Sequence, residues 1–186
     1  MAAPFLDLDS SELVALERAV SELSGMTNDF RPEWPAVTKA ISRAIASRFR
    51  QEGPGWAPLA KSTQRDRLRK GYGAAHPILV REGDLRRSFL DGSVQMYAPT
   101  QMSYESPSEI APHLHWGAPK ANIPARPIVV AEELLPIAQR AFEEAFVARA
   151  NQVWHAATGR GTFGGRSSAR KARSGAELVA AFQAAS

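Results

Sequence analysis

Apolar residues recur every three or four positions in three stretches of the chain, a spacing typical of helices with one buried face. The stretches predict a helix from about residue 10 to 24, a second from about 35 to 50, and a long third from 132 to 156. Their apolar positions are Leu13, Leu16, Val20 and Leu23, then Val37, Ala40, Ile41, Ala44, Ile45 and Phe49, and finally Leu135, Ala138, Phe142, Phe146 and Val153.

End signals agree with the first two helices. Asp9 and Glu12 have the spacing of a capping box, and Gly25 is expected to end the first helix. Pro35 suits a first helical turn, and Gly53 is expected to end the second helix decisively.

A shorter pattern follows at the centre of the chain. Residues 77–80 form a short apolar run of β type, Gly83 permits a turn, and residues 84–88 form one amphipathic helical turn. Polar and apolar residues then alternate over 93–98, and the pattern resumes at 101–104. This alternation predicts a β-hairpin or two consecutive edge strands.

The next stretch, residues 105–127, contains five prolines and predicts a loop with short extended pieces. Residues 128–130 are a last β-like segment before the long helix. The chain is therefore expected to be an α+β protein: a small antiparallel sheet flanked by N-terminal helices and a long C-terminal helix, with a flexible basic tail.

The 186 residues divide by pattern into three regions. Residues 1–32 are expected to be an N-terminal helical extension and residues 33–157 the α+β domain. Residues 158–186 are predicted to be a flexible basic tail with a short terminal helix.

Charge is spread unevenly. Residues 1–33 carry two basic and seven acidic side chains, whereas residues 43–87 carry eleven basic and four acidic ones. The basic run at 61–70 is predicted to be a short helix capped by Ser62 or Thr63. Such a run is typical of a solvated helix face, and contact with acidic protein or nucleic acid is the alternative.

The residues offer little catalytic chemistry. The absence of cysteine excludes disulfides, thiolate metal sites and thiol nucleophiles. His113 and His115 lack an evident third metal ligand, and the glycine spacing at 159–164 follows a helix rather than the strand that a dinucleotide site needs. We expect no enzyme activity, no metal and no cofactor, and no apolar stretch long enough to span a membrane is present.

Four short segments, in order, resemble the phage virion morphogenesis family, which includes tail completion and neck proteins of Mu-like and related tailed phages. Gly55-Trp56-Ala57-Pro58-Leu59, followed by Ser62-Thr63 and basic residues, resembles the family's opening motif. Pro77-Ile78-Leu79 with Gly83-Asp84-Leu85-Arg86-Arg87-Ser88, His113-Leu114-His115-Trp116-Gly117, and Ile123-Pro124-Ala125-Arg126-Pro127-Ile128 are similar to its later motifs. The resemblance covers about residues 37–150, with Glu82 where Thr is common and Ile110 where Tyr is usual.

The resemblance implies a structural virion protein that joins the head and portal side to the tail tube as a ring, often a hexamer. Neighbouring neck and tail proteins are the implied partners, and the virion is the implied location after assembly in the host cytoplasm. Transient contact with DNA in the lumen of the ring is a further expectation. We expect Leu85 to fill the core, and Arg86 or Arg87, with Arg126, to bridge to an adjacent subunit or across the loop. The assembly candidates are Trp56, Leu59, Gly83, Leu85, Arg86, Arg87, Ser88, His115, Trp116, Gly117 and Arg126.

The alternative function is that of a nucleic-acid-binding accessory protein. It would use the 61–70 run together with the basic residues of 158–175. The candidate contacts in that tail are Arg160, Arg166, Arg170, Lys171 and Arg173.

Overall fold

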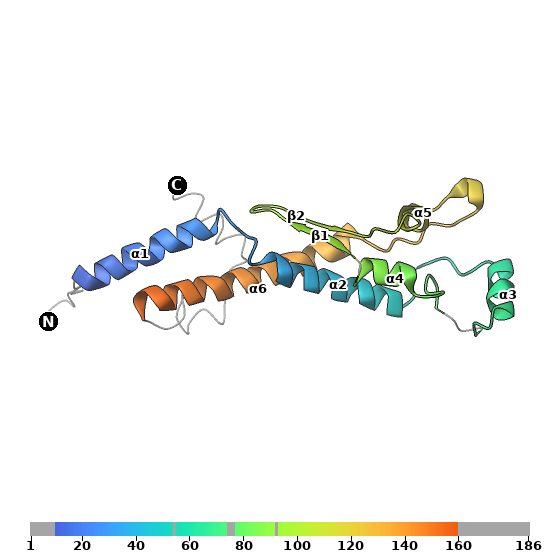
Figure 1. Ribbon diagram of the computed structural model, residues 1–186, viewed down its shortest axis with the longest axis horizontal. Coiled ribbons are helices and arrows are strands. Elements are labelled where there is room, and N and C mark those ends of the chain that lie inside the picture. The colour runs from blue at the N-terminus through green and yellow to red at the C-terminus, as the bar shows by residue number, and fades with distance from the viewer. Residues whose placement is uncertain (1–9, 54, 74–76, 92, 160–186) are drawn as a thin grey trace, which may run out of the picture. The chain divides into compact units, whose positions relative to one another are not determined.

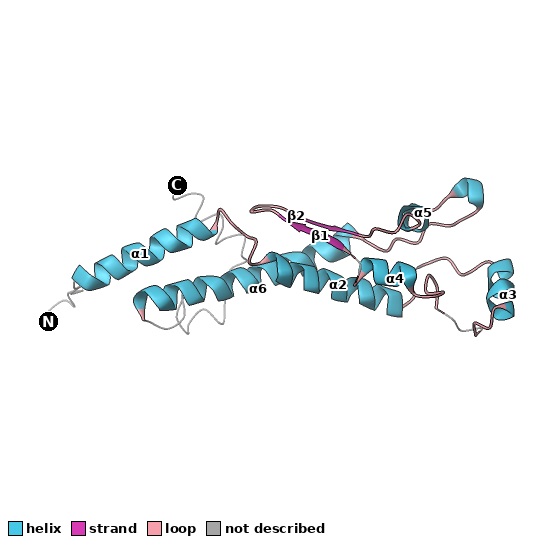
Figure 2. Cartoon of the chain, viewed as in Figure 1, coloured by secondary structure: helices cyan, strands magenta, loops and turns pink. Residues whose placement is uncertain are grey.

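The computed structural model describes residues 10–53, 55–73, 77–91 and 93–159. The described chain confirms the mixed fold, with six helices and one two-stranded antiparallel sheet (Figures 1 and 2). The elements are α1 (Ser10–Met26), α2 (Trp34–Arg50), α3 (Lys61–Arg69), α4 (Asp84–Phe89), β1 (Val94–Tyr97), β2 (Met102–Glu105), α5 (Ala111–Trp116), the 3₁₀ turn η1 (Pro119–Ala121) and α6 (Ala131–Thr158). The predicted tail lies outside the described residues from 160 onward.

The described residues form two compact units. One contains α1 and the part of α6 from residue 142, and the other contains residues 31–141. The domain limits expected at residues 33 and 157 stay a prediction.

The first unit is a pair of helices held by an apolar seam. Leu23 and Met26 of α1 are buried with Ala150 of α6, and Phe146, Val153 and Trp154 pack around them. Arg149 donates to the carbonyls of Met26 and Asp29, at 3.4 and 3.1 Å. These bonds satisfy acceptors at the C-terminal end of α1, which an isolated helix leaves without a partner.

The β-hairpin of the second unit is attached to α2 by polar side chains. Trp34, Thr38 and Ser42 lie four residues apart and therefore share one helix face. The Trp34 indole donates to the Ala98 carbonyl at 2.8 Å. The Thr38 and Ser42 hydroxyls bond the hydroxyls of Tyr97 and Tyr104, each at 2.9 Å.

The core of the second unit lies further along the same face of α2. Ile45 and Phe49 of this helix are buried against Trp56, against Leu85 and Phe89 of α4, and against Ala111 and Ile128. Because these residues come from five parts of the chain, their burial brings the predicted motif segments together.

The strand predicted at 77–80 is wrong. These residues form a turn closed by a bond from the Val80 amide to the Pro77 carbonyl, with Leu79 at a φ of 60°. Ile78, Leu79 and Val80 still pack on the core. The sheet has only β1 and β2 within the described chain, so the run has no strand to pair with.

Two further predictions around the proline-rich stretch are also wrong. Residues 128–130 form no strand, and residues 111–116 form helix α5 rather than loop. Pro112 sits in the first turn of α5, where its missing N–H costs nothing.

The ends of the predicted helices need smaller corrections. Helix α1 continues through Gly25 to Met26. Helix α3 begins at Lys61 after Ala60, with no side-chain capping bond, so neither Ser62 nor Thr63 caps it. Leu135, predicted on the apolar face of α6, is 67% exposed.

Candidate functional site

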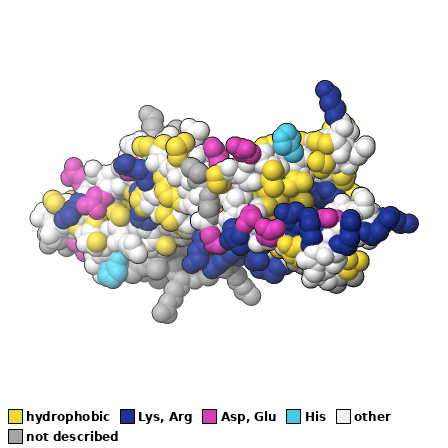
Figure 3. Space-filling model, turned by 45° about the vertical axis from the view of Figure 1, so that its right-hand side comes forward, with side chains coloured by type: hydrophobic (Ala, Val, Ile, Leu, Met, Phe, Trp, Pro, Cys, Tyr) yellow, Lys and Arg dark blue, Asp and Glu magenta, His cyan; other side chains and the backbone are white. Residues whose placement is uncertain are grey.

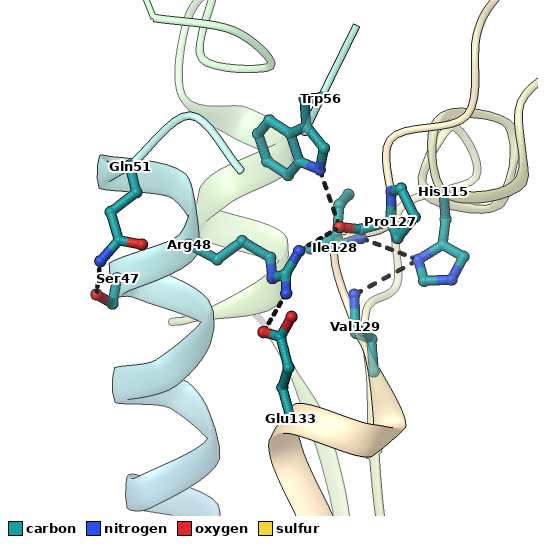
Figure 4. Close-up of polar contacts among 9 residues, drawn as sticks. All are labelled: Ser47, Arg48, Gln51, Trp56, His115, Pro127, Ile128, Val129 and Glu133. Atoms are coloured by element: carbon teal, nitrogen blue, oxygen red, sulfur yellow. Dashed lines mark hydrogen bonds and ion pairs between the residues drawn. The ribbon is translucent and has the colours of Figure 1, made fainter. Parts of the chain in front are cut away.

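The carbonyl of Pro127 is the meeting point of three parts of the chain (Figure 4). The Trp56 indole donates to it at 2.9 Å, and Arg48 of α2 donates to it at 3.2 Å. The second terminal nitrogen of Arg48 pairs with the carboxylate of Glu133 at the start of α6. One peptide oxygen therefore ties the segment around Trp56 to both α2 and the proline-rich segment.

Arg126 fastens the same two segments a second time. Its side chain is only 5% exposed and donates to the carbonyls of Ala57 and Pro58, at 3.0 and 3.3 Å. Its amide donates to the Leu114 carbonyl at 2.8 Å. Desolvation, and then the nearby Arg67, lower the pKa of Arg126 below its ordinary value. Of the two roles expected for Arg126, the contacts show the one within the chain, across the loop.

The side chain of His115 accepts hydrogen bonds from the backbone amides of residues 128 and 129, with which no strand of the described chain pairs. Its Nδ1 accepts the Ile128 amide at 3.1 Å and the Val129 amide at 3.5 Å. An Nδ1 that accepts carries no proton, so the neutral ring holds its proton on Nε2. Desolvation, and then the charge of Arg48, lower the pKa of His115 below its usual value of 6.5.

Trp116 is the most exposed large apolar residue of this region, at 77%. Its ring stands edge-on to His115, with ring centres 4.4 Å apart. Gly117 follows at a φ of 80°, and a Cβ there would lie 2.8 Å from the Ala125 amide nitrogen and 2.9 Å from the Ile123 carbonyl oxygen. Only glycine fits this close approach, which fixes the backbone immediately after Trp116.

The segment from Gly83 to Ser88 divides its residues between core and surface. Gly83 has a φ of 85° at the start of α4, as the predicted turn requires, and Leu85 is buried in the core as expected. The Ser88 hydroxyl donates to the Leu85 carbonyl at 2.7 Å and bonds the Ser106 hydroxyl at 2.8 Å. Leu85, through burial, and Ser88, through its hydrogen bonds, therefore stabilise the chain around α4.

The two arginines of this segment differ. Arg87 pairs with Asp84 and donates to the Glu82 carbonyl at 3.2 Å, whereas Arg86 is exposed. Neither Arg86 nor Arg87 bridges the described loop.

Leu59 is half-buried and follows Ala57 and Pro58, the residues that Arg126 bonds.

Arg48 and Glu133 are the participants that sequence reasoning missed as site residues. Arg48 lies next to Phe49 on α2, and a basic residue beside an apolar stripe usually snorkels to solvent. Its burial was detectable only from the partners that the fold supplies: Pro127 and Glu133.

The network holds three segments of the second unit together. Its main donors and acceptors satisfy one another, and no nucleophile stands beside a base in it. Within the described ranges, no three His, Asp or Glu side chains are arranged to hold a metal ion. No helix of the described chain combines the length and apolar character needed to cross a membrane. The candidate contacts from Arg160 to Arg173 lie outside the described residues.

Comparison with family models, with curated proteins and with solved structures finds no match for this chain.

Proposed function

We propose that this chain is a structural virion protein of a tailed bacteriophage, which assembles as a ring of copies in the neck or upper tail. As a tail completion, tail terminator or head-tail connector protein it would join the portal side to the tail tube. It acts by binding neighbours and carries no catalytic centre.

The observation that carries the proposal is the convergence of the resembling segments. Residues 55–59, 83–88, 113–117 and 123–128 all contribute side chains to one apolar core. Hydrogen bonds also join 55–59 and 113–117 to 123–128. These segments would then be the rigid frame of the subunit, with Trp56, Leu85 and Arg126 inside it.

Trp116 is the residue of the frame best placed to contact another copy. It is exposed on a backbone fixed by His115 on one side and Gly117 on the other. Rigid, exposed tryptophans are enriched among the residues that dominate binding energy at protein interfaces, because they bury a large area at little entropic cost.

The test is the oligomeric state of the purified full chain, measured by native mass spectrometry and electron microscopy, alone and with the neighbouring virion proteins. We expect a discrete ring, and we expect Trp116→Ser to shift it toward monomer. The matched control is Leu135→Ser, which removes an exposed apolar side chain outside the network. A wild-type protein that stays monomeric even with its neighbours present would overturn the proposal.

A further inference from the structure

Helix α3 presents a line of cations on one of its faces. Lys61, Arg65 and Arg69 lie four residues apart, so they share a face and follow one another about 6 Å apart along the helix axis. All three are exposed. Figure 3 shows dark blue Lys and Arg side chains projecting at the end of the second unit that carries α3.

The remaining basic residue of α3, Arg67, and the C-cap residue Lys70 are both bonded within the chain. Arg67 is buried and donates to the Pro77 carbonyl at 3.0 Å, on the opposite side of the helix. Lys70 pairs with Asp66 at 2.9 Å. Among the described residues, Lys61, Arg65 and Arg69 make no ion pair, although the charge of Arg69 acts with Lys70, whose hydrogen bond is the larger cause, to lower the pKa of Asp66. The structure thus separates three available cations from two occupied ones in a run that looks uniform in sequence.

Hydrogen bonds connect α3 and the segment before it to the rest of the second unit. Arg126 holds the backbone at Ala57 and Pro58, just before α3. The side-chain amide of Gln64 donates to the Leu59 carbonyl at 2.8 Å, and Arg67 donates to the Pro77 carbonyl on the far side of the helix.

Polar composition decides the kind of partner. Protein interfaces have an apolar centre from which lysine is depleted, whereas this face offers one half-exposed apolar side chain, Leu68, beside three cations. Exposed Lys and Arg on a helix are the usual ligands of phosphate oxygens in nucleic-acid complexes, and these contacts need no base sequence. The face therefore fits phosphodiesters better than it fits an acidic protein.

We propose that Lys61, Arg65 and Arg69 form a binding surface for the sugar-phosphate backbone of a nucleic acid. The surface does not depend on ring formation and goes beyond the proposed structural role. Within a ring around DNA it would contact the duplex without reading its sequence.

The experiment compares the full chain with two triple variants of equal charge. One is Lys61→Gln, Arg65→Gln and Arg69→Gln, and the control is Lys39→Gln, Arg43→Gln and Arg50→Gln, three exposed residues of α2. Binding to a fluorescent mixed-sequence DNA duplex and to the corresponding single strand is measured by anisotropy from low to moderate salt. Basic residues beyond position 159 are unchanged in both variants.

The expected result for the duplex is a salt dependence weakened specifically by the α3 variant. Each lost phosphate contact reduces the slope of log K against log salt by about 0.9, so three contacts reduce it by about 2.7, and by about 2.1 for the single strand. The α2 variant is expected to keep a slope close to that of the full chain. Whichever strand form binds more tightly identifies the source of the phosphates.

Three outcomes would overturn the inference: no binding by the full chain, equal losses in both variants, or a loss of the ring in the α3 variant without a change in DNA binding. The last would assign the face to a protein partner. Oligomeric state is measured on the same samples, so failure of this inference is distinguishable from failure of the ring.

Discussion

Replacing Arg126 by methionine tests whether the network holds the second unit together. Methionine keeps much of the apolar stem but removes the donors to the Ala57 and Pro58 carbonyls, at 3.0 and 3.3 Å. A hydrogen bond from a charged donor contributes about 1.5–3 kcal/mol. Part of that loss is offset because a desolvated cation, whose pKa is lowered by its surroundings, is no longer buried. We expect a net destabilisation of about 2–4 kcal/mol.

Urea unfolding followed by tryptophan fluorescence measures the effect. For a slope of about 2 kcal/mol per M, the transition midpoint is expected to fall by about 1–2 M. Arg126→Lys should lose part of this stability, because an ammonium group cannot reproduce the planar fork that reaches both carbonyls.

The matched control is Arg86→Met, because Arg86 is exposed on the same unit. It is expected to change stability by less than about 0.5 kcal/mol, as surface substitutions usually do. If Arg126→Met were as mild as Arg86→Met, the network would be irrelevant to the stability of the unit.

Three further predictions follow from neighbouring contacts. The folded-state pKa of His115 is depressed, so its contribution to stability is complete above the usual pKa of 6.5 and is lost as pH falls below that value. A series of urea midpoints measured at falling pH should show this loss of stability. His115→Gln should make the loss smaller, whereas His113→Gln should leave it unchanged. Gly117→Ala adds a clash with the backbone and should destabilise the protein by more than about 2 kcal/mol in thermal unfolding. The control is Gly55→Ala, which has a similar positive φ but open space around it and should cost about 1–2 kcal/mol. Equal losses in the two variants would show that the clash at Gly117 is relieved. Tyr104→Phe removes bonds to the Phe89 carbonyl and the Ser42 hydroxyl and should cost about 1–2 kcal/mol by the same assay, an unchanged midpoint being the contrary result.

The sequence predicted the elements whose signals are local. Periods of three and four located α1, α2 and α6, and alternation located the hairpin, because side-chain direction along a helix or strand follows from backbone geometry alone. The apolar run at 77–80 misled for the same reason: its composition suits a strand, but a strand also needs a neighbour to pair with.

Among the candidate site residues, composition and motif order located the segments but not the role of each side chain. Arg86, Arg87 and Arg126 are equivalent as letters, yet one is exposed, one pairs locally and one is buried across a loop. Arg67 differs from Arg65 in being buried and in donating to the Pro77 carbonyl.

By itself, then, the sequence determined the described helices other than α5, the hairpin, the charge asymmetry and the order of the four motif segments. Only the tertiary structure decided that His115 accepts hydrogen bonds from the amides of Ile128 and Val129. It also decided that the Pro127 carbonyl accepts from Trp56 and Arg48, and that Trp116 stays exposed. The physical reason is that burial and hydrogen-bond partnership depend on residues distant in sequence, and only packing specifies which of them meet.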